Sequence, residues 1–255
     1  MSPPPPSSPP DPRCTQAVWD RSYETHALAA AATDDPLRRW LESRMRGHRG
    51  SCLELGCFPG RFLAVMGELG FELHGVDLTP RVATDLVPWL AGRGHRLGRF
   101  ARADLFRYPY PQRYDVVCSF GVIEHFADWP AFLSHQAGLV APGGIIVVTA
   151  PNFRGFVQRA LHRWLDRENY DRHCLAAMRP AAWAAHLAGR GWTVLEHGGL
   201  GAFDFWVEPA ERGPPARAAL WLASTLRRPA ARILPADASW CSPYLRLIAR
   251  RPLTD

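Results

Sequence analysis

The segment at residues 51–60, SCLELGCFPG, constrains the fold of this chain more than any other. Its apolar start is typical of a buried strand, its glycines indicate a tight turn, and the apolar spacing over residues 60–69 indicates a helix. An open α/β sheet holds nucleotide-like ligands at such a turn, at the carboxyl ends of its strands. The turn lacks the G-x-G-x-x-G pattern that seats a pyrophosphate, and Glu54 lies two positions before Gly56. These features disfavour a dinucleotide and favour a ligand that carries an amine.

The alternation of strand and helix patterns continues to residue 150. Predicted strands cover residues 51–56, 71–77, 98–103, 114–120 and 143–150. Predicted helices between them cover residues 60–69, 80–91 and 130–140, and we expect Pro88 to kink or stop the second of these helices. The fourth strand is almost wholly apolar, as a central strand of a parallel sheet is. Repeated βαβ units at this spacing predict an α/β fold with a Rossmann-like, doubly wound sheet.

Helical patterns dominate the regions on either side of this core. Residues 1–13 are rich in proline and predict a disordered tail. Further helices are expected at residues 15–30, 36–46, 153–165, 179–191 and 214–228. Residues 192–198 and 242–252 predict a sixth and a last strand, so helical insertions follow the fifth strand and recur near the C-terminus.

Composition indicates an ordinary globular protein of the cytoplasm. The chain has 255 residues, of which 47% are hydrophobic and 21% charged. No run approaches the roughly 18 apolar residues of a membrane span, and the N-terminus lacks the pattern of a secretory signal. The six cysteines form no C-x-x-C pair, which disfavours a zinc site built from cysteines and fits a reducing compartment.

The net charge is +6, and all 30 of the Lys and Arg residues are arginine, because the sequence contains no lysine. The arginines are scattered along the chain instead of being clustered, and a nucleic-acid site needs basic residues gathered on one face. We therefore expect that nucleic acid is not the partner.

Five motifs in order resemble those of the class I S-adenosylmethionine-dependent methyltransferases. They are ELGCFPG, GVDLT, ARADLF, YDVVCSFGVIEHFADW and LVAPGGIIVVTAPN. The resemblance is strongest over residues 50–152, and it is closest to the small-molecule branch that includes the quinone-biosynthesis O-methyltransferases. It implies a mostly parallel sheet with an antiparallel last strand, and S-adenosylmethionine as the cofactor.

The resemblance also assigns the cofactor-binding residues. Glu54 matches the acidic residue that contacts the methionine ammonium, and Gly56 and Gly60 give the turn its freedom. Asp77, at the end of the second strand, matches the acceptor of both ribose hydroxyls, and Leu78 would cover the adenine. Glu54 as a helix cap and Asp77 as a plain turn residue remain alternatives.

Two further positions complete the expected cofactor site. Asp104 matches the acceptor of the adenine amino group, with Leu105 beside it, although a structural role for Asp104 stays open. Phe120 ends the fourth strand, where the methionine part of the cofactor is expected.

Glu124 and His125 follow the fourth strand, where the reacting methyl group would project. Methyl transfer is an in-line displacement that depends on alignment, and an oxygen nucleophile gains from a base such as histidine. We predict His125 as the base or substrate-orienting group, with a structural role as the alternative. A related small-RNA 2′-O-methyltransferase family binds a metal with a Glu-His pair and an earlier carboxylate. That earlier position is Gly121 here, so no metal is expected. The alternative is that His173 completes a replacement ligand set with Glu124 and His125.

Substrate contacts are expected from both flanking regions. Trp19 and Tyr23 would belong to lid helices at residues 15–46, and residues 153–240 would cover the substrate. The candidate lining residues in this cover are Tyr170, His173, Phe203 and Trp206. Residues 14–255 would thus form one domain around the cofactor-binding core.

Together these features predict a methyltransferase that acts on a small-molecule or lipid-like acceptor, with oxygen favoured over nitrogen or carbon. It would convert S-adenosylmethionine to S-adenosylhomocysteine. The alternatives are an RNA methyltransferase and a non-catalytic binding protein with the same fold. Peripheral membrane contact by the cationic helix at residues 214–228 and the oligomeric state stay open.

Overall fold

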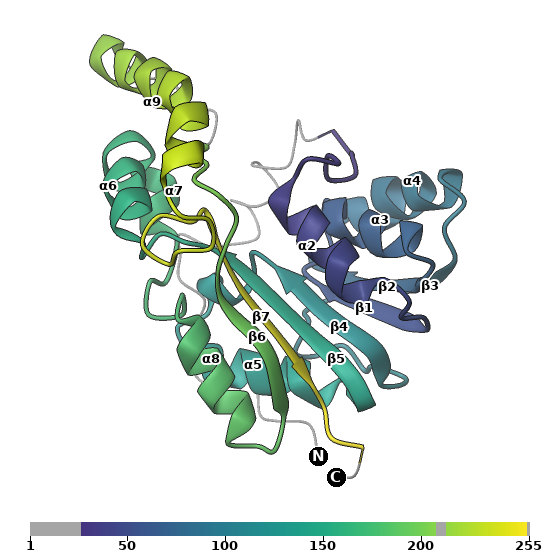
Figure 1. Cartoon of the computed structure of the whole chain (residues 1–255). Coiled ribbons are helices and arrows are strands. Elements are labelled where there is room, and N and C mark those ends of the chain that lie inside the picture. The colour runs from purple at the N-terminus through teal and green to yellow at the C-terminus, as the bar shows by residue number, and fades with distance from the viewer. Residues whose placement is uncertain (1–26, 208–212, 254–255) are drawn as a thin grey trace.

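The computed structural model describes residues 27–207 and 213–253, and its centre is a seven-stranded sheet (Figure 1). The strands lie in the order β3-β2-β1-β4-β5-β7-β6. Their bounds are β1 (Ser51–Leu55), β2 (Glu72–Asp77), β3 (Leu97–Arg102), β4 (Tyr114–Phe120), β5 (Val140–Pro151), β6 (Thr193–Leu200) and β7 (Tyr244–Arg250). The pairs among β1 to β5 are parallel, whereas β7 is antiparallel to both of its neighbours. This arrangement confirms the predicted doubly wound sheet and its antiparallel last strand.

Helices cover both faces of the sheet, and each face has its own apolar core (Figure 1). One face is covered by α2 (Pro36–Met45), α3 (Arg61–Glu68) and α4 (Val87–Gly92), and the other by α5 (Trp129–Gly138) and α8 (Pro180–Ala188). Alternate residues of the central strands enter the two cores: Val116 and Cys118 face α2 and α3, while Val117 faces α5. The near-continuous apolar sequence of β4 is therefore explained by burial on both faces.

The helix predicted at residues 80–91 is divided in two. A π-helical turn, η2 (Val82–Leu86), precedes α4, and Pro88 lies in the first turn of α4. Proline lacks an N–H and its ring clashes with the carbonyl four residues earlier, so a widened turn just before it accommodates the ring. The irregularity expected at Pro88 is thus a π-helical turn directly before α4, and the helix continues beyond this residue.

The helix predicted at residues 153–165 begins three residues later, at Phe156. In the structure α6 (Phe156–Leu165) is preceded by a turn in which the Asn152 carboxamide oxygen accepts the Gly155 N–H at 3.0 Å. Phe153 is buried in the core of the sheet. This turn sends the chain away from the end of β5, and a short helix, α7 (Arg167–Asp171), which the sequence did not predict, follows.

The helix predicted at residues 214–228 is longer than expected. In the structure α9 (Pro214–Ile233) continues through Pro229. None of its side chains is buried, so water can satisfy the backbone carbonyl that Pro229 leaves without a partner. Across the described residues, no helix combines the length and apolar character needed to cross a bilayer.

The N-terminal predictions can be compared with the structure only from residue 27 onward. The helix expected at residues 15–30 does not include residues 27–30, which are irregular. The rest of that helix, the tail at residues 1–13, Trp19 and Tyr23 lie outside the described residues.

Candidate functional site

A cavity of about 290 Å³ opens at the carboxyl ends of β4 and β5. Parallel strands deliver their last residues to this edge of the sheet, and ligands bind there in doubly wound folds. Segments far apart in the sequence line the cavity, and they include Leu37, Arg61, Phe62, Phe120, Gly121, Glu124, His125, Thr149, Phe153, Asn169, His173, Trp206 and Tyr244. The cavity therefore joins residues from the predicted cofactor core and from the predicted substrate cover.

The turn after β1 has the conformation that its glycines allow. Gly56 and Gly60 have φ angles of +69° and +77°, a region that disfavours residues with a Cβ atom. A Cβ atom at Gly56 would also lie 2.8 Å from a methyl group of Val122. Phe58, which occupies the middle of this turn, is buried against the core, and the Arg81 guanidinium lies 4.8 Å from its ring centroid. The bulky residue thus points into the protein and leaves the turn open to a ligand.

Glu54 is a buried carboxyl at the end of β1. Its Oε2 atom has no hydrogen-bond partner among the described residues. Burial, together with the nearby Cys52 and Asp77, raises the pKa of Glu54 well above its ordinary value. A cationic ligand group beside Oε2 would supply the missing partner and favour the carboxylate. The site therefore fits the ammonium group that the sequence resemblance implies.

Asp77 connects the turn after β1 with the end of β2. Its Oδ2 accepts the Phe58 N–H at 3.1 Å, and its Oδ1 accepts the Thr79 N–H at 3.0 Å. Both oxygens of the carboxylate are thus held by backbone N–H groups, and these bonds fix its orientation at the strand end. Leu78, next in the chain, is 48% exposed, which is high for a large apolar residue and leaves its surface available to a flat ring.

Asp104 and Leu105 follow β3 and do not line the cavity. Asp104 Oδ1 accepts the Phe106 N–H at 2.9 Å, so one oxygen is used by a local turn. Oδ2 lies 3.8 Å from Arg107 Nε. The carbonyl oxygen of Leu105 is bonded by Tyr110 at 2.8 Å and by His135 at 2.9 Å. Asp104 therefore has the structural role that the sequence left open, because its Oδ1 atom stabilises the turn after β3. The Asp104 side chain is half-exposed, and its Oδ2 atom lies near the surface.

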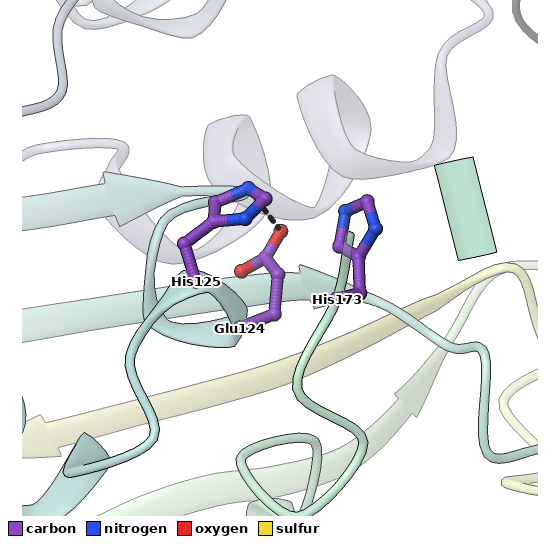
Figure 2. A group of neighbouring side chains, drawn as sticks. All are labelled: Glu124, His125 and His173. Atoms are coloured by element: carbon purple, nitrogen blue, oxygen red, sulfur yellow. Dashed lines mark ion pairs between the residues drawn. The ribbon is translucent and has the colours of Figure 1, made fainter. Parts of the chain in front are cut away.

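Glu124, His125 and His173 converge in the cavity wall (Figure 2). Glu124 and His125 belong to a 3-10 turn, η3 (Ile123–His125), and His173 follows α7. A hydrogen bond from the Cys174 N–H to the Glu124 carbonyl, 2.7 Å long, holds the two segments together. The rings of His125 and His173 have centroids 4.7 Å apart, and Glu124 Oε1 lies 3.9 Å from His125 Nε2. The structure thus brings together the three residues that the sequence grouped as the alternative metal site.

Burial makes this group electrically neutral near pH 7. It raises the pKa of Glu124 to about 8 and lowers the pKa of His173 to about 4. Burial, with the neighbouring His173, lowers the pKa of His125 well below its ordinary value. His173 Nδ1 lies 2.5 Å from the Asn169 carbonyl, which can only accept, so Nδ1 carries the proton and Nε2 has the free electron pair. Neutral imidazoles can accept a proton from a bound hydroxyl.

The same three side chains are the described residues that could hold a metal ion. One ligand atom from each lies within 4.8 Å of the others, and Glu124 Oε2 has no hydrogen-bond partner within the described part of the chain. Gly121, on the cavity wall, contributes no side-chain ligand. A cation here would have at most one carboxylate and two imidazoles from this group.

Aromatic rings form the remaining walls. Phe120 packs on Phe62 with ring centroids 4.9 Å apart, and Trp206 stacks on Tyr244 at 5.1 Å. Tyr170 and Phe203, two other predicted substrate residues, are buried outside the cavity lining. Of the four candidates in the predicted cover, His173 and Trp206 reach the cavity.

Arg61 and Tyr244 are cavity residues that the sequence did not select. Arg61 begins α3 directly after the glycine turn, and its guanidinium lies 3.4 Å from Asp35 and 5.5 Å from the Phe62 ring centroid. Its position after Gly60 is a signal that could have identified it. Tyr244 enters only because β7 pairs with β5, a long-range contact that no local motif reveals.

Comparison with known proteins gives this architecture a family. Residues 24–197 match the methyltransferase domain family. The ubiquinone biosynthesis O-methyltransferase of Rhodopseudomonas palustris (strain BisB5) is 29% identical over 158 residues, which make up 58% of this chain and 60% of that relative. The chain thus matches less than two thirds of the relative's length.

Two solved structures share the fold. One is magnesium protoporphyrin IX methyltransferase from Synechocystis PCC 6803 with bound S-adenosylhomocysteine (TM-score 0.53, 15% identity, 91% of this chain and 92% of that chain). The other is N-methyltransferase NodS from Bradyrhizobium japonicum WM9 with the same ligand (TM-score 0.50, 16% identity, 94% and 89%). The family match covers more than half of this chain, and the sheet order and site geometry agree with it. The chain therefore belongs to the methyltransferase domain family, as its ordered motifs predicted.

Proposed function

We propose that this protein transfers a methyl group from S-adenosylmethionine to the oxygen of a small or lipid-like acceptor, leaving S-adenosylhomocysteine. The observation that carries the proposal is the cavity at the ends of β4 and β5, in which His125 and His173 face one another as neutral imidazoles. The family membership and the O-methyltransferase name of the curated relative support the reaction type.

The proposed cofactor site follows the ends of β1, β2 and β3. Glu54 meets the ammonium group, because its buried Oε2 atom otherwise has no partner among the described residues. Gly56 and Gly60 keep the backbone of the turn close to the ligand, and Asp77 accepts the ribose hydroxyls.

The adenine is proposed to lie on Leu78, with the exposed oxygen of Asp104 and the neighbouring Leu105 at its edge. Phe120 then lies at the methionine end, on the boundary of the cavity. The residues that would hold the cofactor thus follow one another along the strand ends, and Phe120 connects them to the cavity.

S-adenosylmethionine supplies an electrophilic methyl group whose carbon–sulfur bond breaks as the new carbon–oxygen bond forms. His125 accepts the hydroxyl proton of the acceptor, which leaves the oxygen lone pair to form that bond. Glu124, protonated at neutral pH and 3.9 Å from His125, adds no charge beside the imidazole. The buried position of both groups excludes water, so alignment of the acceptor oxygen supplies much of the rate.

The acceptor is proposed to bind against the aromatic side of the cavity. Trp206, stacked on Tyr244, and the ring of Phe120 offer flat apolar surface, and His173 Nε2 offers a hydrogen-bond acceptor. A phenolic or other hydroxylated compound with apolar substituents matches these groups. Residues 153–240 would then cover the acceptor, and the N-terminal segment at residues 15–46, with Trp19 and Tyr23, would close over it.

The direct test incubates the full chain with isotope-labelled S-adenosylmethionine and two fractions from the source organism, a lipid and small-molecule extract and total RNA. We expect label in compounds of the first fraction whose mass increases by one methylene unit. Label confined to RNA would overturn the proposed acceptor class. Cofactor binding without label in either fraction would favour a non-catalytic binding protein.

A further inference from the structure

Two helices outside the sheet present large apolar side chains to solvent. From α6, Phe156 is 78% and Trp164 67% exposed; from α9, Trp221 is 69% and Ile233 82% exposed, and Leu222 and Leu226 are each about half exposed. These six residues are called the apolar patch below. The two helices contact one another and project together beyond the carboxyl ends of the central strands (Figure 1). Soluble proteins rarely leave so many large apolar groups uncovered on neighbouring helices.

The apolar residues of α9 share one side of the helix. At about 100° per residue, Trp221, Leu222, Leu226 and Ile233 fall within a sector about 140° wide. Arg217, Arg228 and Arg232 lie along one edge of that sector. An apolar stripe bordered by cations is the pattern of a helix that lies in the plane of a membrane surface.

The charges on these helices have one sign. α6 and α9 together contain six arginines, all exposed, and no aspartate or glutamate. The arginines are Arg159, Arg163, Arg217, Arg227, Arg228 and Arg232. Arg227 Nη1 lies 3.0 Å from Oδ1 of Asp204, a residue outside both helices. Two copies of this surface would repel each other, whereas an anionic surface would complement it.

We propose that α6 and α9 dock the protein onto the surface of an anionic lipid bilayer. The apolar patch enters the boundary between headgroups and acyl chains, where tryptophan is favoured, and the arginines contact lipid phosphates. α6 also connects this surface to the cavity, because the ring of its His162 lies 5.6 Å from the ring of Trp206. The inference goes beyond the proposed reaction and does not depend on it.

The test measures flotation of the full chain with vesicles of neutral phosphatidylcholine, and with the same vesicles containing phosphatidylglycerol. We expect binding to the anionic vesicles that weakens steeply as salt is added, because screening acts on exposed charges. Trp221→Ser/Ile233→Ser and Arg228→Gln/Arg232→Gln should each reduce the partition coefficient about tenfold. The matched controls are Leu195→Ser, at a half-exposed position of β6, and Arg39→Gln/Arg46→Gln, at an exposed position of α2 and at its exposed C-cap; both should retain binding.

The salt titration of the unaltered protein keeps the proposal testable if a variant fails to fold. Equal binding to neutral and anionic vesicles would contradict the role of the arginines. The protein could instead bind neither type of vesicle, elute as a dimer, and become monomeric in Trp221→Ser/Ile233→Ser. That result would contradict lipid docking and identify a second copy of the chain as the partner of the apolar patch. Absence of both vesicle binding and self-association would overturn the docking surface.

Discussion

The cofactor half and the acceptor half of the proposed site are held by different kinds of contact. On the cofactor side, Asp77 is fixed by backbone N–H groups of Phe58 and Thr79, which are near it in sequence or at the adjacent strand end. On the acceptor side, the N–H of Cys174, next to His173, bonds the Glu124 carbonyl across 50 residues of chain, and Trp206 stacks on Tyr244 of β7. The first half is specified by short motifs and the second by tertiary packing. Substitutions in the two halves should therefore separate cofactor affinity from turnover and acceptor affinity.

His125→Ala is expected to give the largest effect. Loss of the proposed base should lower the turnover number about a thousandfold, while the affinity for S-adenosylhomocysteine changes less than about threefold. Steady-state kinetics and calorimetry measure the two quantities. His197→Ala, at an exposed position of β6, is the control and should leave both unchanged. Equal loss of affinity and turnover would place His125 in a structural role.

Asp77→Ala should have the next largest effect, on the other half of the site. Removal of the carboxylate deletes the ribose acceptors and frees the two backbone N–H groups that it holds, so the dissociation constant for S-adenosylhomocysteine should rise about a hundredfold. Asp171→Ala, which removes an exposed partner of Arg167, serves as the control. Unchanged cofactor affinity in Asp77→Ala would remove this residue from the proposed site.

Glu124→Gln tests whether the Glu124 carboxyl is protonated in the folded protein, through the pH dependence of the free energy of unfolding. The folded protein keeps the Glu124 proton up to its pKa of about 8, whereas the unfolded chain releases it near 4.5. The stability contributed by the protonated form is therefore present at low pH and is lost as pH rises through this window. Relative to Glu124→Gln, the unaltered protein should lose about 3 kcal/mol of unfolding free energy between pH 5 and pH 8. Urea titrations at both pH values measure this difference, and a difference that is independent of pH would contradict it.

Trp206→Ala should affect the acceptor side alone. Loss of the stacked ring should raise the KM for the acceptor about tenfold and leave cofactor affinity unchanged. Trp89→Ala, which removes a ring of α4 outside the cavity lining, is the matched control. A change in cofactor affinity in Trp206→Ala would show that the acceptor half of the proposed site affects the cofactor half.

Removal of metal should have the smallest effect. Because His125 is proposed to act as a base, activity after treatment with a chelator should stay within about twofold of the untreated protein. The measurement is the initial rate before and after chelation, followed by addition of Mn²⁺ or Mg²⁺. Activity that is lost and then restored by either cation would assign Glu124, His125 and His173 as its ligands.

The sequence was sufficient for the sheet and much less so for the acceptor side. Strand patterns and glycine turns are local, so the sheet, the turn at Gly56 and an irregular helix near Pro88 could be predicted. The burial of Phe58 depends on the core beneath the turn, and the position of Tyr244 depends on the pairing of β7 with β5. Both are consequences of contacts between distant segments, which a single sequence does not display.

Aromatic residues in the predicted cover illustrate the same limit. Tyr170, Phe203 and Trp206 have similar sequence surroundings, with aromatic and polar residues mixed, yet only Trp206 among these three lines the cavity. The helix at residues 214–228 was predicted to stop before Pro229, but exposure to water removes the reason for stopping there. Local patterns identified the residue types correctly, while burial decided which of them face the site.

The most direct test of the account is a calorimetric titration of the full chain with S-adenosylhomocysteine, repeated with Glu54→Gln. We expect one binding site, and weaker binding in the variant because the ammonium group loses its carboxylate partner. Absence of binding by the unaltered chain, or equal affinity in the two proteins, would contradict the proposed cofactor site.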